Sequence, residues 1–266
     1  MKNINLSRSH SARLHRALIE FQMISDGDTI LVGFSGGKDS AFLLYALVAI
    51  QKYLPVNFSI AAATVDLGFP LNNSVNNEIK EFMTRLQVPH FIIKTNISKI
   101  AFSNSQKKNP CAICSHLRRG SLNSFAKDNG YNKVALAHHQ DDAVETFLMS
   151  ILYSGQIHVF SPVTYLDRTG ITAIRPLIYF RESAIKGAMG QIAYNPPPNP
   201  CPSQDKTQRL FVKSLIHKLS KENPMVYTNL FKALHKNAIG DLWPPIASRN
   251  EMKKLYKMFF EKEGNP

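Results

Sequence analysis

Two glycines, a lysine and an aspartate separate two apolar runs in the stretch VGFSGGKDSAFLLYAL, which extends from Val32 to Leu47. Glycine lets the backbone approach a ligand closely. Successive backbone amides at the start of a helix form a nest for anions, and the positive end of the helix dipole strengthens it. The stretch therefore predicts a phosphate-binding loop between a strand and a helix.

Two common phosphate-binding motifs do not fit this loop. A Walker A loop is excluded because Val32 stands where its first glycine belongs and Asp39 follows the lysine. The dinucleotide fingerprint is excluded because Gly33 has no glycine two residues later. The pattern that remains is Ser-Gly-Gly-x-Asp-Ser, in which the hydroxyls of Ser35 and Ser40 can donate hydrogen bonds and the aspartate can help to hold Mg²⁺.

This pattern resembles the pyrophosphatase loop (PP-loop) of the ATP pyrophosphatase superfamily. The resemblance implies that the loop holds the β- and γ-phosphates of ATP and leaves the α-phosphate open to attack. The products would be a nucleotidylated substrate and pyrophosphate. The residues that this assigns to ATP are Ser35, Gly36, Gly37, Lys38, Asp39 and Ser40.

A second polar turn, ALAHHQDDAVET, also follows an apolar run. Its simplest interpretation is a helix start, because Asp142 and Glu145 are spaced as a capping box. In a sheet of order 3-2-1-4-5, however, the loops after the first and fourth strands flank one crevice. We therefore interpret His139 and Asp142 as contacts of ATP or Mg²⁺, and leave the roles of His138 and Asp141 open.

The chain has three cysteines, two of them in PCAICSHLRRGSL. Zinc would need a fourth ligand, for which His116 is the conceivable candidate, so a closed zinc site is poorly supported. A 4Fe–4S cluster held by Cys111, Cys114 and Cys201 would leave one iron without a protein thiolate, open to sulfur or substrate. A thiol–disulfide sulfur relay and three unrelated thiols remain as alternatives.

Strand-like and helix-like segments alternate along the chain and must position these motifs. This alternation predicts the α/β class, with a doubly wound parallel sheet. We expect a basic helical segment at 1–27, an ATP-binding domain at 28–193 with an inserted Cys-x-x-Cys segment, and a Cys201 loop with a basic helical region at 194–266. The expected strands are 28–34, 58–66, 90–96, 133–139 and 172–177, and the expected helices are 40–50, 76–88, 115–130 and 141–155.

Composition limits the partners and the location. A net charge of +13 and a pI near 9.7 indicate a polyanionic partner such as nucleic acid. Too few cysteines are present for a secreted disulfide framework. The longest apolar run, Ala41 to Ile50, is about half of the roughly 20 residues that a membrane span needs. We expect a cytoplasmic protein that does not span a membrane.

Five motifs in order resemble the tRNA 2-thiocytidine synthetase family (TtcA): FQMISDGDTILVGFSGGKDS, PCAICSHLRRGSL, ALAHHQDDAVETFLMSILYSGQ, IRPLIYFRE and PCPSQDKTQR. The resemblance implies that ATP and a cysteine-bound iron–sulfur cluster replace the C2 oxygen of an anticodon-loop cytidine with sulfur. It makes Cys111, Cys114 and Cys201 the cluster ligands and tRNA the polyanion. A sulfur donor such as a cysteine desulfurase and a homodimeric state are further expectations.

The implied reaction begins when the C2 oxygen of cytidine attacks the α-phosphorus of ATP. Lys38 and Mg²⁺ on Asp39 would offset the phosphate charge. We expect Arg175 to contact ATP, whereas the roles of Arg118, Arg119 and Asp66 stay open. Two alternatives remain: another PP-loop tRNA enzyme, such as a lysidine synthetase, and a non-catalytic, metal-containing tRNA-binding protein.

Overall fold

The structure is a computed structural model that describes residues 4–69, 73–102, 110–198, 201, 207–235 and 248–261. Its contacts divide the chain into two compact units, Met1–Phe231 and Lys232–Pro266. The first unit holds the sheet and its covering helices, and the second holds helix α10 (Arg249–Glu261). The domain boundaries expected after residues 27 and 193 stay predictions.

A six-stranded sheet of order β3-β2-β1-β4-β6-β5 forms the centre of the first unit. Its first five members in that order pair in parallel, which confirms the α/β class and the expected placing of the fourth strand beside the first. The edge strand β5, which pairs antiparallel with β6, was not predicted from the sequence. The strands are β1 Asp28–Gly33, β2 Phe58–Asp66, β3 His90–Lys94, β4 Lys133–Ala135, β5 Val163–Leu166 and β6 Ile171–Ile174.

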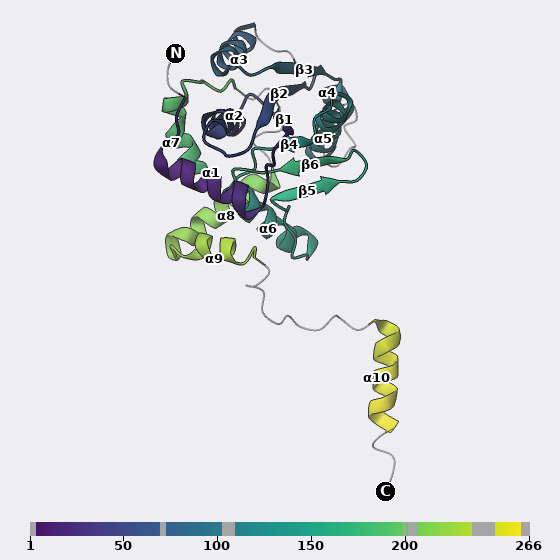
Figure 1. Cartoon of the computed structure of the whole chain (residues 1–266). Coiled ribbons are helices and arrows are strands. Elements are labelled where there is room, and N and C mark those ends of the chain that lie inside the picture. The colour runs from purple at the N-terminus through teal and green to yellow at the C-terminus, as the bar shows by residue number, and fades with distance from the viewer. Residues whose placement is uncertain are drawn as a thin grey trace. The chain divides into compact units, whose positions relative to one another are not determined.

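Helices cover both faces of this sheet. Figure 1 shows the strands running between α2 on one side and α4 and α5 on the other. Helix α2 is buried around most of its surface, because it lies between the sheet, α1 and α7. The helices of the first unit are α1 Arg8–Glu20, α2 Lys38–Gln51, α3 Asn73–Leu86, α4 Ile97–Phe102, α5 Pro110–Asp128, α6 Gln140–Ser154, α7 Glu182–Ile192, α8 Gln208–Glu222 and α9 Val226–Lys232, the last of which ends at the unit boundary.

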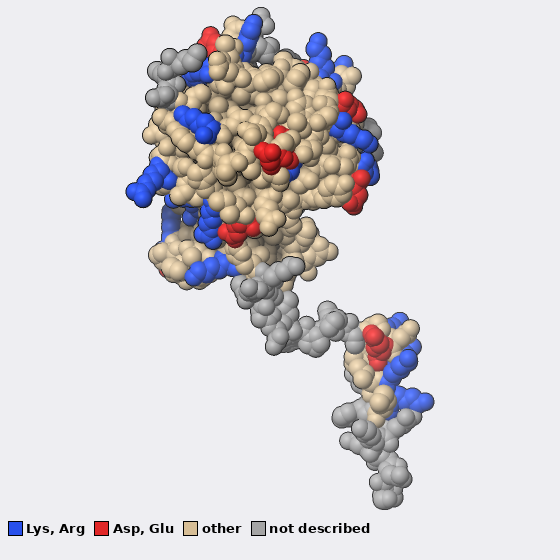
Figure 2. All heavy atoms as spheres, in the orientation of Figure 1, with Lys and Arg blue, Asp and Glu red and all other residues tan. Residues whose placement is uncertain are grey.

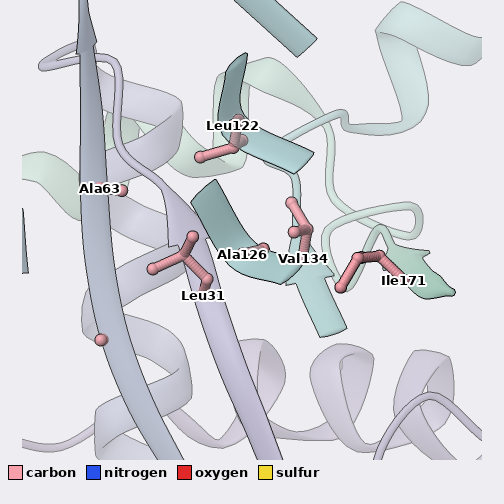
Figure 3. Packing of buried hydrophobic residues seen from close by; sticks show 7 residues of the cluster. Leu31, Ala63, Leu122, Ala126, Val134 and Ile171 are labelled. Atoms are coloured by element: carbon pink, nitrogen blue, oxygen red, sulfur yellow. The ribbon is translucent and has the colours of Figure 1, made fainter. Parts of the chain in front are cut away.

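Helix α5 packs on one face of the sheet through a small apolar cluster. Leu31, Ala63 and Val134 come from three neighbouring strands and meet Leu122 and Ala126 of the helix (Figure 3). The two alanines let helix and sheet approach closely, and each leucine buried here contributes about 2 kcal/mol. The cluster therefore fixes the helix that carries two of the cysteines.

Several elements begin or end away from the expected residues, among them α5 and β6. Helix α5 begins at Pro110, not at residue 115, so Cys111 and Cys114 lie within its first turns. Proline suits the first turn of a helix because its missing N–H has no partner to bond there. Strand β6 ends at Ile174, because Pro176 cannot donate to a ladder.

Charged residues are spread over the surface of the first unit. On the face seen in Figure 2, Lys and Arg lie mostly toward the margin, and uncharged residues cover most of the middle. Within the described residues, no helix combines the length and the apolar character that crossing a membrane needs.

A buried ion pair ties the starts of β1 and β4 together. The Asp28 carboxylate lies 2.6 Å from Lys133 Nζ and accepts hydrogen bonds from Ser25 N and Asn132 Nδ2. Lys133 Nζ also donates to the Met23 carbonyl. Burial alone would raise the pKa of Asp28, but the ammonium and the two donors lower it on balance. The carboxylate is therefore held in its charged form.

Replacing Asp28 by alanine should lower the free energy of unfolding by about 3 kcal/mol or more, because Lys133 is left as a buried charge without its carboxylate. The measurement is urea unfolding at pH 7. Because the folded-state pKa is lowered, the contribution of Asp28 is present above the unfolded pKa of about 3.9 and is lost as the pH falls through the folded value. The variant should therefore lose less stability on acidification than the native chain does.

The matched control is Asp167→Asn, which changes an exposed carboxylate in the turn between β5 and β6. It should shift the free energy of unfolding by no more than about 0.5 kcal/mol. Equal shifts for Asp28→Ala and Asp167→Asn would contradict a structural role for the buried pair.

Candidate functional site

The loop between β1 and α2 is shaped by hydrogen bonds of its own serines. Ser40 Oγ donates to the Gly37 carbonyl at 2.9 Å and lies 3.1 Å from Ser35 Oγ. Gly36 has φ +80°, a conformation that favours glycine, and its carbonyl accepts a hydrogen bond from the Tyr194 hydroxyl. The loop opens helix α2 with no side-chain cap on its first amides, which suits an anion.

Lys38 is held between two carboxylates at this loop. Its Nζ lies 2.9 Å from Asp39 Oδ2 and 3.1 Å from Glu182 Oε1. Glu182 also pairs with Lys186 and, at 2.5 Å, with Lys213. Burial would raise the pKa of Glu182, but the three ammonium groups lower it to about 2. Glu182 was not predicted from the sequence as a site residue, although it closes the motif IRPLIYFRE.

The turn after β4 faces the same loop. His139 Nε2 lies 3.8 Å from Asp39 Oδ1, so the two motifs meet as the strand order predicted. The capping box is present three residues earlier than expected: His139 accepts from Asp142 N, and Asp142 accepts from His139 N. The Asp142–Glu145 box is wrong because α6 begins at Gln140.

One carboxylate oxygen of Asp39 is available to bind a hard cation such as Mg²⁺. Its Oδ1 is buried and has no hydrogen-bond partner among the described residues. Asp142 is more fully used, since Oδ1 lies 2.8 Å from Arg209 and Oδ2 accepts from the His139 amide. Magnesium in ATP-using sites takes one or two carboxylates together with phosphate oxygens and waters, so Asp39 fits it.

Helix α8 is attached to the first turns of α6 and α7 through two cations. Arg209 binds Asp142, donates to Thr146 Oγ1 and lies 3.9 Å from Glu145. Lys213 binds Glu182. Burial raises the pKa of Glu145 to about 7, with Arg209 opposing the shift. The segment after Cys201 thus completes the polar surroundings of the phosphate loop.

Asp141 positions the start of helix α7. It accepts a hydrogen bond from Glu182 N at 2.7 Å and lies 3.2 Å from Arg181 Nε. The guanidinium of Arg181 lies over the Tyr227 ring, 3.2 Å from its centroid. The described contacts therefore give Asp141 a structural task. Asp66 accepts from Gly68 N within its own turn.

Helix α5 brings the cysteine pair to the carboxyl edge of the sheet. A Cβ at Gly33, the last residue of β1, would lie 2.9 Å from Leu122 Cδ2. The helix therefore reaches the strand end at Leu122, and the turns before it, with Cys111 and Cys114, extend beyond that edge.

The pKa of the Cys114 thiol is affected by the other two cysteines. Burial raises its pKa, the Arg118 guanidinium lowers it, and Cys201 and Cys111 raise it further. Cys201 is thus within electrostatic reach of the pair. In the part of the chain that the structure describes, no group of three or more His, Cys, Asp and Glu residues is arranged to hold a metal ion. The donor types suit a 4Fe–4S cluster, and the ligand role of the three thiols stays a prediction.

Arg175 and His138 both lie against the ring of Phe160. Arg175 donates from one terminal nitrogen to the Ser161 carbonyl and to Thr164 Oγ1. Burial and the charge of Arg119 lower its pKa to about 10. Burial also lowers the pKa of His138 to about 4, so this imidazole is neutral at pH 7. The ATP contact expected of Arg175 stays a prediction.

The comparisons with known proteins agree with this arrangement. Residues 9–198 match the family described as the PP-loop domain. A tRNA-cytidine(32) 2-sulfurtransferase 1 from Francisella tularensis subsp. novicida is 36% identical over 237 residues, which cover 86% of this chain and 86% of that protein. A tRNA-cytidine(32) 2-sulfurtransferase from Pelobacter propionicus is 34% identical, over 88% of this chain and 87% of that protein.

A solved structure shares the fold. The U34-tRNA thiolase NcsA from Methanococcus maripaludis, solved with its 4Fe–4S cluster, superposes with a TM-score of 0.67 over 87% of this chain and 78% of that one, at 20% identity. The sheet order, the loop geometry and the extent of the sequence similarity lead to one conclusion: the chain belongs to the PP-loop family and, within it, to the tRNA-cytidine(32) 2-sulfurtransferases.

Proposed function

We propose that this protein is an ATP-dependent tRNA sulfurtransferase that makes 2-thiocytidine in the anticodon loop, at position 32 as its relatives' names indicate. One observation carries the proposal: the phosphate loop, with its unpartnered Asp39 oxygen, and the Cys-x-x-Cys helix converge on the same edge of the sheet. A lysidine synthetase-like reaction has no use for such a pair of thiols.

Activation would take place at the phosphate loop. The amides of the loop would hold the β- and γ-phosphates, and the cytidine C2 oxygen would attack the α-phosphorus. That step forms an O–P bond, expels pyrophosphate and turns a poor leaving group into AMP. Lys38 stays protonated, since its two carboxylates raise its pKa against the effect of burial. Its charge and Mg²⁺ on Asp39 would stabilise the charge that develops on the phosphates.

The thiols would hold the cofactor. Cys111, Cys114 and Cys201 would bind a 4Fe–4S cluster, which supplies an iron atom that can carry sulfur to the activated base. Burial raises the pKa of the Cys114 thiol, and the Arg118 guanidinium opposes this rise and so helps the thiolate form that a metal binds. The basic excess of the chain fits a tRNA partner.

Partners and location complete the proposal. A sulfur donor such as a cysteine desulfurase would reload the site, and the protein would work in the cytoplasm, where tRNA is. The homodimeric state stays a prediction.

Asp39→Ala should abolish pyrophosphate release in the presence of tRNA, because Mg²⁺ loses its carboxylate while the core is untouched. The loss of rate should be at least about a hundredfold, the scale of one strong electrostatic contact in a transition state. The assay follows pyrophosphate with Asp167→Asn as the control, which should keep the native rate. Native turnover in Asp39→Ala would contradict the PP-loop assignment.

Cys201→Ala should lower the iron content, bleach the visible absorption and stop 2-thiocytidine formation, while ATP binding persists. Iron per chain, the absorption spectrum and nucleoside analysis of tRNA measure these effects. Asp39→Ala serves as the reciprocal control, since it should keep its iron. A Cys201→Ala protein with full iron and normal thiolation would show that Cys201 is no ligand.

A further inference from the structure

A cavity of about 300 Å³ lies between helix α5 and the β5–β6 hairpin, apart from the phosphate loop. Its walls include Leu122 and Asn123 of the helix, Leu136 after β4, and Phe160 in the segment before β5. The volume lies at the small end of the roughly 300–1,000 Å³ of ligand pockets. The cavity is therefore suited to a group much smaller than a whole ATP molecule.

Flat side chains gather at one wall of the cavity. The Phe160 ring lies 5.0 Å from the His138 ring and 5.1 Å from the Arg175 guanidinium, centre to centre. With Leu122 and Leu136, Phe160 gives the cavity a mainly apolar lining that favours a planar ring.

Two buried polar atoms beside the cavity have no partner. Arg175 is 8% exposed, and its Nε makes no hydrogen bond to the described residues, although its terminal nitrogen is anchored. His138 Nδ1 is likewise buried and unpartnered. A buried donor left unpaired is costly, so a ligand with hydrogen-bonding atoms at the edge of a ring would gain by entering here.

The cavity lies near the residues proposed for both steps of the reaction, the phosphate loop and the cysteine pair. His138 precedes His139, which lies 3.8 Å from the metal-binding candidate Asp39. On the other side, Arg119 lines the cavity, and the adjacent Arg118 acts electrostatically on both His138 and Cys114. A base whose C2 must meet first ATP and then sulfur has to lie between these two places.

We propose that the cavity receives the target cytosine itself, turned out of the anticodon loop, with its ring on Phe160 and its hydrogen-bonding edge toward Arg175 and Asn123. This assignment rests on the proposed function and gives it a place for the base. Single-stranded RNA loops are recognised in this way, by an unstacked base against an aromatic ring and donors at its edge.

The probe is an anticodon stem-loop RNA in which the fluorescent analogue pyrrolocytidine replaces the target cytidine. Its fluorescence should change when native protein binds. Phe160→Ala should remove the change and weaken binding by about tenfold, since base stacking on an aromatic side chain accounts for about 5- to 150-fold in affinity. Asn123→Ala, a milder change on helix α5, should weaken binding without loss of fold.

Two controls test whether the effect of Phe160→Ala depends on the target base. Tyr165→Ala removes a 62%-exposed aromatic ring of β5 that does not line the cavity, and it should bind the probe as the native protein does. A stem-loop with an abasic site at the target position should bind native protein and Phe160→Ala equally, because the ring then has nothing to stack on. A merely structural role for Phe160 would weaken both RNAs alike.

The outcomes separate the two proposals. A native protein that forms no 2-thiocytidine in tRNA would contradict the proposed function. A native protein that thiolates tRNA, while folded Phe160→Ala and Asn123→Ala proteins bind the probe like Tyr165→Ala, would overturn the cavity assignment alone.

Discussion

The parallel pairing of β1 with β4 is the constraint on which the site depends. These strands come from distant parts of the chain and meet in the register Ile30 to Lys133 and Val32 to Ala135. Since parallel neighbours end at the same edge, their loops must face each other, and Asp39 meets His139 there. The Asp28–Lys133 pair holds the opposite ends of the same two strands. One buried pairing thus places both walls of the proposed nucleotide site.

Close packing extends this order to the cysteines. Gly33 leaves room for Leu122 at the end of β1, and Ala63 and Ala126 let the helix lie close to the sheet. The helix start is therefore placed by the core and not by a loop of its own. The cavity beside α5 lies where the short and only partly buried strand β5 forms the edge of the sheet.

Much of this could be predicted because the signals are local. The phosphate loop, the polar turn after β4 and the alternation of elements are each contained in a short stretch of sequence. Glu182, Arg209 and Lys213 could not be predicted, since a single charge on a helix acquires its partner only through the fold. Strand β5 was missed because its four residues alternate too little to be recognised, whereas α6 was expected within one residue of its observed bounds, Gln140–Ser154.

The attachment of α8 has a consequence for the order of synthesis. Arg209 and Lys213 bind carboxylates that lie many residues earlier in the chain, on α6 and α7. A ribosome that has made the whole sheet and the phosphate loop has still not delivered these two cations. Until α8 is made, Asp142 lacks its ion pair with Arg209 and Glu182 lacks its ion pair with Lys213. The nascent chain therefore has an incomplete ion-pair network beside the phosphate loop. The enzyme is thus completed by a late segment, after the sheet that carries the chemistry has already been translated.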